Sequence, residues 1–207
     1  MRKTIIARLF DRDGAIRSGF RRLRANENGS AAIEFAILAT PFLLLVFAII
    51  ETFIAFGAEQ LLNHGVDTLG RQLRTGQITF DTGAATDVTE DEFQDLFCEQ
   101  VKILIDCDGT WGTRLFLDVR SFPDFKDIPI GIPRLNGDSR GDLDTSDFDF
   151  APGGASRINI VRAYFKWRVL TDIVRPYITN IDASEGAMPE YYLMVATTAF
   201  RNEAYDR

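Results

Sequence analysis

The residues of this chain best suited to chemistry are Gly29 and Glu34, which lie five positions apart. Ser30, Ala31 and Ala32 follow the glycine. A glycine followed by small side chains leaves the backbone accessible to a protease. Hydrolysis of the bond after Gly29 would create a new amine at Ser30, beside the Glu34 carboxylate. The sequence therefore predicts a cleavable peptide bond next to an acidic side chain.

The apolar run after Glu34 predicts a membrane span. Residues 35–50 are uncharged and almost wholly apolar. A helix that continues to Gly57 is long enough, at about 1.5 Å per residue, to cross a hydrocarbon core of about 30 Å. A carboxylate inside such a segment is costly and usually has a partner or a function. The alternative is that Glu34 only favours the positive end of the helix dipole and reaches the headgroups.

Charge is distributed unevenly around this span. Residues 1–29 contain eight basic and three acidic side chains, a local charge of +5, so the remainder of a chain of net charge −7 carries −12. Basic residues close to a span stay in the cytoplasm, whereas a long following domain crosses the membrane largely regardless of its charge. We therefore expect a single pass, with the basic leader in the cytoplasm and the C-terminal domain outside it.

The segment from Gly29 to Phe35 resembles the cleavage motif of Flp-type pilins and of the TadE-like pseudopilins of tight-adherence secretion systems. In that motif a glycine and four further residues precede Glu-Phe, as Gly29 precedes Glu34 and Phe35 here. The similarity continues through the apolar run to residues 57–62 and the amphipathic stretch that follows. Residues 197–203 are similar to the terminal strand of TadE-like proteins. The resemblance covers residues 28–76 and the last twenty residues.

This resemblance implies that a prepilin peptidase cuts between Gly29 and Ser30. Glu34, followed by Phe35, would then act in assembly by neutralising the N-terminal amine of a neighbouring subunit, because a complementary charge reduces the cost of an isolated charge at membrane depth. The implied role is that of a minor pilin or pilus assembly protein in the biogenesis of a Flp-type pilus. The implied location is the inner membrane of a Gram-negative bacterium, with the domain in the periplasm. The implied partners are the prepilin peptidase, the major Flp pilin, TadF- or TadG-like subunits, the Tad membrane platform and the lipid bilayer.

Two helices are predicted beyond the span. Apolar residues recur at every third or fourth position, which indicates an amphipathic helix, and Gly76 provides a C-terminal stop. The apolar positions are Ala58, Leu61, Leu62, Gly65, Val66, Leu69 and Leu73. A second helix is predicted from Thr89, because Thr89 and Glu92 have the spacing of a capping box.

Cys98 and Cys107 are the only cysteines, and a location outside the cytoplasm favours a disulfide between them. Nine residues of unbroken helix would separate their Cα atoms by about 13 Å, whereas a disulfide needs roughly 5 to 6 Å. The helix must therefore end near Leu104 and fold back through Ile105 and Asp106. The alternative is two buried free thiols.

Residues 113–120, 157–170 and 191–200 have the composition and alternation of strands. Such strands favour an antiparallel sheet with one face buried against the helices, hence an α+β fold. The predicted organisation is a leader (1–29), a transmembrane helix (30–57), its continuation outside the membrane (58–76) and an α+β domain (77–207). Residues 79–86 and 131–154 are predicted to be loops.

No motif predicts an enzyme, a cofactor or a metal site. The sequence has neither a glycine-rich phosphate loop nor a nucleophile elbow. Five aspartates of the second loop could surround calcium, but their spacing departs from the EF-hand pattern and we expect a solvated acidic loop. They are Asp138, Asp142, Asp144, Asp147 and Asp149. His64 has no ligand partner beside it, and the acidic exterior disfavours nucleic acid.

Two alternatives belong to other classes. The first is an uncleaved, signal-anchored envelope protein with a periplasmic binding or sensor domain. The second is a secreted protein released after Ala55-Phe56-Gly57 by ordinary signal peptidase. Against the second, the leader is long and the apolar stripe continues past Gly57 without a break.

Overall fold

The computed structural model describes residues 30–107, 114–182 and 188–205, so the predicted leader (1–29) lies outside the described residues. The chain divides into two compact units, Met1–Phe47 and Ala48–Arg207. Within the first unit, the described residues form the beginning of helix α2 (Ser30–Arg74), which continues through Pro41. This helix is long and apolar enough to cross a membrane, and none of its most apolar stretch is buried.

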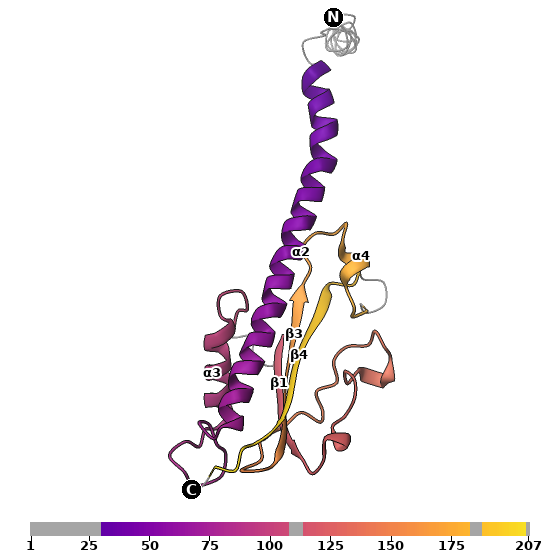
Figure 1. Cartoon of the computed structure of the whole chain (residues 1–207). Helices are drawn as coiled ribbons and strands as arrows, with labels where there is room; N and C mark the ends of the chain where they lie inside the picture. Colours follow the sequence, from indigo (N-terminus) through magenta and orange to yellow (C-terminus); the bar gives the residue numbers. More distant parts are fainter. Residues whose placement is uncertain (1–29, 108–113, 183–187, 206–207) are drawn as a thin grey trace, which may run out of the picture. The chain divides into compact units, whose positions relative to one another are not determined.

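The second unit combines a sheet with helices (Figure 1). Its helices are α2 from Ala48 onward, α3 (Glu90–Val101) and the short α4 (Arg175–Ile178). The strands are β1 (Leu115–Phe122), β2 (Phe150–Ala151), β3 (Ile158–Arg168) and β4 (Tyr191–Arg201). Two 3-10 turns, η2 (Phe125–Asp127) and η3 (Leu135–Gly137), lie in the long connection between β1 and β2. The predicted α+β class is confirmed.

The strands form one sheet in the order β2-β1-β3-β4. β3 pairs antiparallel with β1, with Leu115 opposite Phe165, and antiparallel with β4, with Ile158 opposite Arg201. The three predicted strands therefore pair as expected. β2 was not predicted, because two residues are too few to show a strand pattern. It pairs parallel to β1, which makes the sheet mixed and not purely antiparallel.

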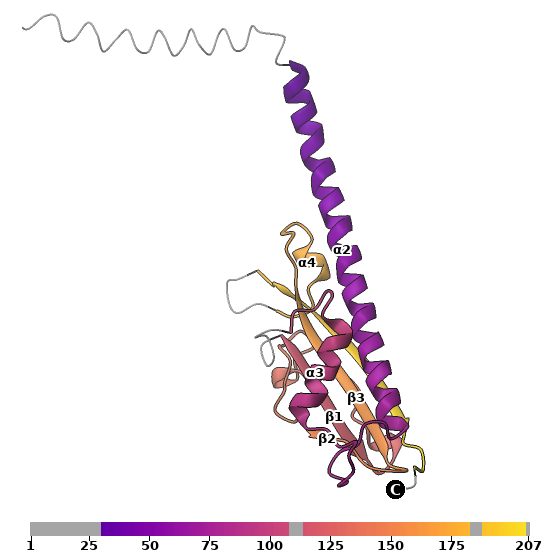
Figure 2. The ribbon, with the colours of Figure 1, turned by 90° about the vertical axis from the view of Figure 1, so that its left-hand side faces the viewer.

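Helices α2 and α3 cover one face of the sheet (Figure 2). The predicted apolar face of α2 is buried from Ala58 to Leu73, and α3 adds Phe93, Phe97 and Val101 to the same core. Gly70 allows α2 to approach β4 closely, since a Cβ added there would lie 2.6 Å from Thr198 Cγ2. This face matches the pattern read from the sequence.

The other face of the sheet is also covered, in addition to the face that was predicted to be buried against the helices. A second core contains Leu143, Tyr164, Ile181 and Leu193. The first eight residues of β3 are all buried as a result, including the polar Asn159. The residues that cover this face, such as Leu143 and Ile181, lie in irregular segments of the chain. No periodic pattern in the sequence therefore predicts their burial.

The helix ends follow local signals. α2 ends at Arg74, and Gly76 adopts a left-handed φ of 74°, as expected of a glycine that stops a helix. Thr89 caps α3 in the predicted capping box with Glu92. α3 ends at Val101, slightly earlier than the predicted position near Leu104, because the chain already turns through residues 102–104.

Candidate functional site

The start of α2 carries the residues predicted to act in cleavage and assembly. Gly29 lies outside the described residues, and Ser30 is the first residue of α2. Glu34 is exposed, and the Phe35 side chain is 72 % exposed. Within the described part of the chain, no hydrogen bond or ion pair involves the Glu34 carboxylate. The carboxylate is therefore free, within these residues, to bind a group from outside the chain.

The apolar side chains of α2 around Glu34 are not buried against the described residues. Most of its large apolar side chains are exposed, among them Ile37, Leu38, Phe42, Leu45 and Phe47. A helix that is apolar on all sides is stable only when a membrane or other helices surround it. Its composition therefore indicates a single-pass membrane anchor.

Glu51 is a buried acidic residue of α2 that the sequence pattern did not single out. Its side chain is only 7 % exposed, although it lies within an apolar stretch of α2. Its carboxylate accepts hydrogen bonds from the backbone N–H groups of Leu170 and Thr171, the second at 2.9 Å. These bonds fasten the segment after β3 to α2. The available signal was the charge itself, because an acidic residue that interrupts an apolar run needs a partner.

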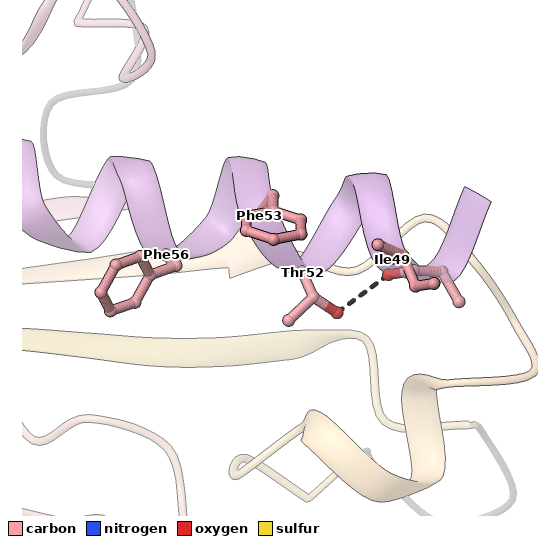
Figure 3. Close-up of a pocket in the computed structure, with 5 residues that line it drawn as sticks. Ile49, Thr52, Phe53 and Phe56 are labelled. Carbon is pink, nitrogen blue, oxygen red and sulfur yellow. Dashed lines mark hydrogen bonds between the residues drawn. The ribbon is translucent and has the colours of Figure 1, made fainter. Parts of the chain in front are cut away.

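Two adjoining surface grooves lie beside Glu51. One, of about 440 Å³, is lined by α2 alone, and Figure 3 shows Ile49, Thr52, Phe53 and Phe56 along it. The Thr52 hydroxyl donates to the Ala48 carbonyl at 2.9 Å, which leaves the groove apolar. The other, of about 370 Å³, lies between α2, α4 and the ends of β3 and β4. Thr52 and Phe56 line both grooves.

The disulfide between Cys98 and Cys107 is present, with the two Cα atoms 6.0 Å apart. The fold-back after α3 makes this separation possible, as the spacing argument required. Val101 and Ile105, on either side of the turn, are fully buried. The disulfide thus fixes the turn after α3 against the core formed with α2.

The turn that joins α2 to α3 is organised by Asp87. Its carboxylate accepts hydrogen bonds from the Thr79 hydroxyl at 2.6 Å, from the Thr82 hydroxyl at 2.5 Å and from the backbone N–H of Gly83 at 2.7 Å. These bonds favour the charged form, led by the one from Thr79, and lower the pKa of Asp87 to about 2. The predicted 79–86 loop is therefore an ordered turn.

The aspartates of the 131–154 loop make separate contacts. Asp142 pairs with Lys166 at 2.6 Å, and Asp144 accepts from the Ser146 hydroxyl at 2.7 Å. Hydrogen bonds from Ser146 lower the pKa of Asp144. In the described residues, no three histidine, cysteine, aspartate or glutamate side chains lie close enough to hold a metal ion. His64 is exposed on α2.

The fold and the helix together define an α+β protein with a single-pass membrane anchor. Residues 29–71 match the family model described as TadE-like protein. Residues 29–71 therefore carry a TadE-like domain, which confirms the resemblance noted for this part of the sequence and supports a place in the Tad/Flp pilus system. TadE-like proteins are pilus-associated structural proteins and not an enzyme family. No curated protein and no solved structure matched the chain.

Proposed function

We propose that this chain is a TadE-like minor pilin or pilus assembly protein that acts in the biogenesis of a Flp-type pilus, and thereby in adhesion and biofilm formation. The observation that carries the proposal is the TadE-like match, which begins at Gly29 and contains Glu34. The first part of the match coincides with the start of α2, in which Glu34 and most large apolar side chains are exposed. Such a helix is suited to packing against other subunits.

In the proposed mechanism, a prepilin peptidase cuts the bond between Gly29 and Ser30. The leader (1–29) and the peptidase lie on the cytoplasmic side, and the C-terminal domain lies in the periplasm. The processed helix diffuses in the inner membrane and docks against other pilin-like helices. Glu34 fixes the register by pairing with the N-terminal amine of a neighbouring subunit, and Phe35 packs beside it.

The proposed partners are the prepilin peptidase, the major Flp pilin, TadF- or TadG-like subunits and the Tad membrane platform. The α+β domain selects among these subunits. Its exposed surface is suited to this role because the disulfide and the packing of α2 against the sheet hold it in one conformation.

The experiment that tests the proposal is N-terminal sequencing, with intact mass, of the protein purified from its native membrane. The comparison is between cells with and without the prepilin peptidase. We expect a mature chain that begins Ser30-Ala31-Ala32 only when the peptidase is present. A chain that begins at Met1 in both strains would contradict processing and favour an uncleaved, signal-anchored envelope protein.

A further inference from the structure

The segment that Glu51 fastens to α2 carries an exposed apolar surface. Leu170 is 71 % exposed, Ile173 is 56 % exposed and Tyr177 is 86 % exposed. We call these three residues the juxtamembrane rim. They lie on the segment after β3 and on α4. Exposed apolar side chains that lie within one short segment are a feature of interaction surfaces.

The depth of Glu51 places the rim relative to a bilayer. The uncharged run 35–50 has sixteen residues, which measure about 24 Å as a helix. This length is short of the hydrocarbon thickness of about 30 Å. The predicted span 30–57 supplies the missing length, and it includes the turn of α2 that contains Glu51, Phe53 and Ile54. Phe53 is 70 % exposed and Ile54 is 42 % exposed, as suits residues in contact with lipid.

The segment bonded to Glu51 must lie at the same depth. The two backbone N–H groups that bind the carboxylate belong to Leu170, a member of the rim, and to Thr171. These bonds also explain how α2 tolerates a carboxylate at this level, because a buried acidic group needs hydrogen-bond donors. With the predicted span 30–57, the rim therefore lies near the membrane boundary.

The grooves beside Glu51 make the rim continuous with the lipid-facing surface of α2. Thr52 and Phe56 belong to the groove along α2 and also to the groove that reaches Tyr177. Trp167 and Tyr192 line the second groove as well. Tryptophan and tyrosine are enriched where proteins cross the membrane–water interface. In Figure 3, Thr52 and Phe56 point to the side of α2 on which the strands lie.

We propose that the juxtamembrane rim is a second membrane contact, in which Leu170, Ile173 and Tyr177 insert into the interfacial region of the bilayer that α2 crosses. The occupant of this surface is lipid. The adjoining grooves accept acyl chains, because they are apolar and open beside α2. The contact sets the height and orientation of the α+β domain on the membrane. It goes beyond the proposed pilus function and depends only on the membrane anchor.

The test uses the full-length protein with its disulfide intact, reconstituted at low protein-to-lipid ratio in phosphatidylcholine–phosphatidylglycerol vesicles. Separate variants, Ile173→Cys and Tyr177→Cys, are labelled with an environment-sensitive fluorophore. The matched control is Ala155→Cys, an exposed site beside the start of β3. The eleven residues of β3 separate the two ends of that strand by roughly 33 Å at about 3.3 Å per residue.

We expect nitroxide lipids labelled at a shallow acyl position to quench the fluorophore at 173 and at 177 at least threefold more than at 155. Quenching at both sites equal to that at 155 would overturn the proposal. A second result would also overturn the proposal: a blue shift of the fluorophore emission that increases with the protein-to-lipid ratio and is not accompanied by quenching from the nitroxide lipids. In that case the rim would bind a second copy of the chain. Two rim sites are labelled separately, so that the test still gives a result if one of the two substitutions disturbs the fold.

Discussion

At the scale of single residues, two carboxylates hold the connections of the α+β domain in place. Glu51 binds the segment after β3, and Asp87 organises the turn between α2 and α3. Glu51 accepts hydrogen bonds from two backbone N–H groups, and Asp87 accepts them from two hydroxyls and from the backbone N–H groups of Thr82 and Gly83. Because an unpaired buried donor costs more than a hydrogen bond gains, we expect Glu51, which is buried, to matter more for the fold than most exposed acidic residues.

We predict that Glu51→Leu destabilises the α+β domain by about 1–3 kcal/mol, because two backbone N–H groups lose their acceptor. The measurement is urea unfolding of the full-length protein in detergent micelles, together with hydrogen exchange at the amides of Leu170 and Thr171. Both amides should exchange faster in the variant. The control is Glu59→Gln, on the same helix, which should change stability by less than about 0.5 kcal/mol. Unchanged exchange at both amides in Glu51→Leu would contradict the assigned role.

We predict that Asp87 makes stability depend on pH in the acid range. Its pKa is about 2 in the folded protein, against an ordinary value of 3.8. A lowered pKa means that the carboxylate stabilises the fold above about pH 3.8, and that this contribution disappears as the pH falls through about 2. Asp87→Asn should therefore be less stable than wild type at pH 7, and the difference should shrink between about pH 4 and 2.

The measurement for Asp87 is the free energy of unfolding of both proteins across this pH range. Asp95→Asn is the control, since Asp95 is an exposed carboxylate of α3 and should leave stability at pH 7 unchanged. A constant difference between Asp87→Asn and wild type from pH 7 to pH 2 would rule out the proposed hydrogen-bond origin.

At the scale of elements, two glycines in the sequence of α2 allow this helix to pack closely against α3 and the sheet. Gly65 and Gly70 lie on the buried face of α2. A Cβ at Gly65 would lie 3.1 Å from the Phe97 ring of α3. At Gly70 the closest atoms belong to Thr198 and Phe200 of β4. Small residues at these positions allow α2 to contact both neighbours at once.

We predict that Gly70→Leu destabilises the domain by about 1–3 kcal/mol, because the larger side chain forces α2 away from β4. Leucine is used because its bulk exceeds the space beside Thr198 and Phe200, so that the steric cost outweighs the gain in helix propensity of up to about 1 kcal/mol that alanine or leucine would bring. Arg71→Leu, at the exposed neighbouring position, should stay within about 0.5 kcal/mol of wild type. Thermal or urea unfolding of the full-length protein distinguishes the two, and equal stability of the two variants would argue against close packing at Gly70.

At the scale of the whole molecule, one helix serves two environments. Its side chains between Ala31 and Phe47 lie mostly exposed, whereas from Ala58 to Leu73 its apolar face belongs to the core of the α+β domain. A change near its start should therefore affect partners and leave the fold intact. A change in its second half should affect the fold.

We predict that Glu34→Gln abolishes or strongly reduces pilus assembly in cells, because the amide lacks the charge that the proposed pairing with a neighbouring amine requires. The variant should keep the wild-type unfolding midpoint, since no bond within the described residues depends on Glu34. Glu59→Gln serves as the control and should assemble pili normally. Pilin recovered from the cell surface is the measurement, and normal amounts from Glu34→Gln would show that its charge is dispensable.

The sequence by itself determined the features that depend on local or periodic patterns. The apolar run predicted the membrane helix, and the three- and four-residue spacing predicted the buried face of α2. The capping box at Thr89, the stop at Gly76 and the three main strands were also predicted. The fold-back that joins Cys98 to Cys107 followed from the length of a helix.

Only the tertiary structure decided the features that depend on residues far apart in the chain. The bonds from Leu170 and Thr171 to Glu51 cross about 120 positions, and the second core under the 131–154 loop joins residues of several segments. Irregular segments bury their side chains without any period, so a sequence pattern cannot show which sheet face they cover. The partner of a buried carboxylate such as Glu51 is likewise visible only after folding has brought the two segments together.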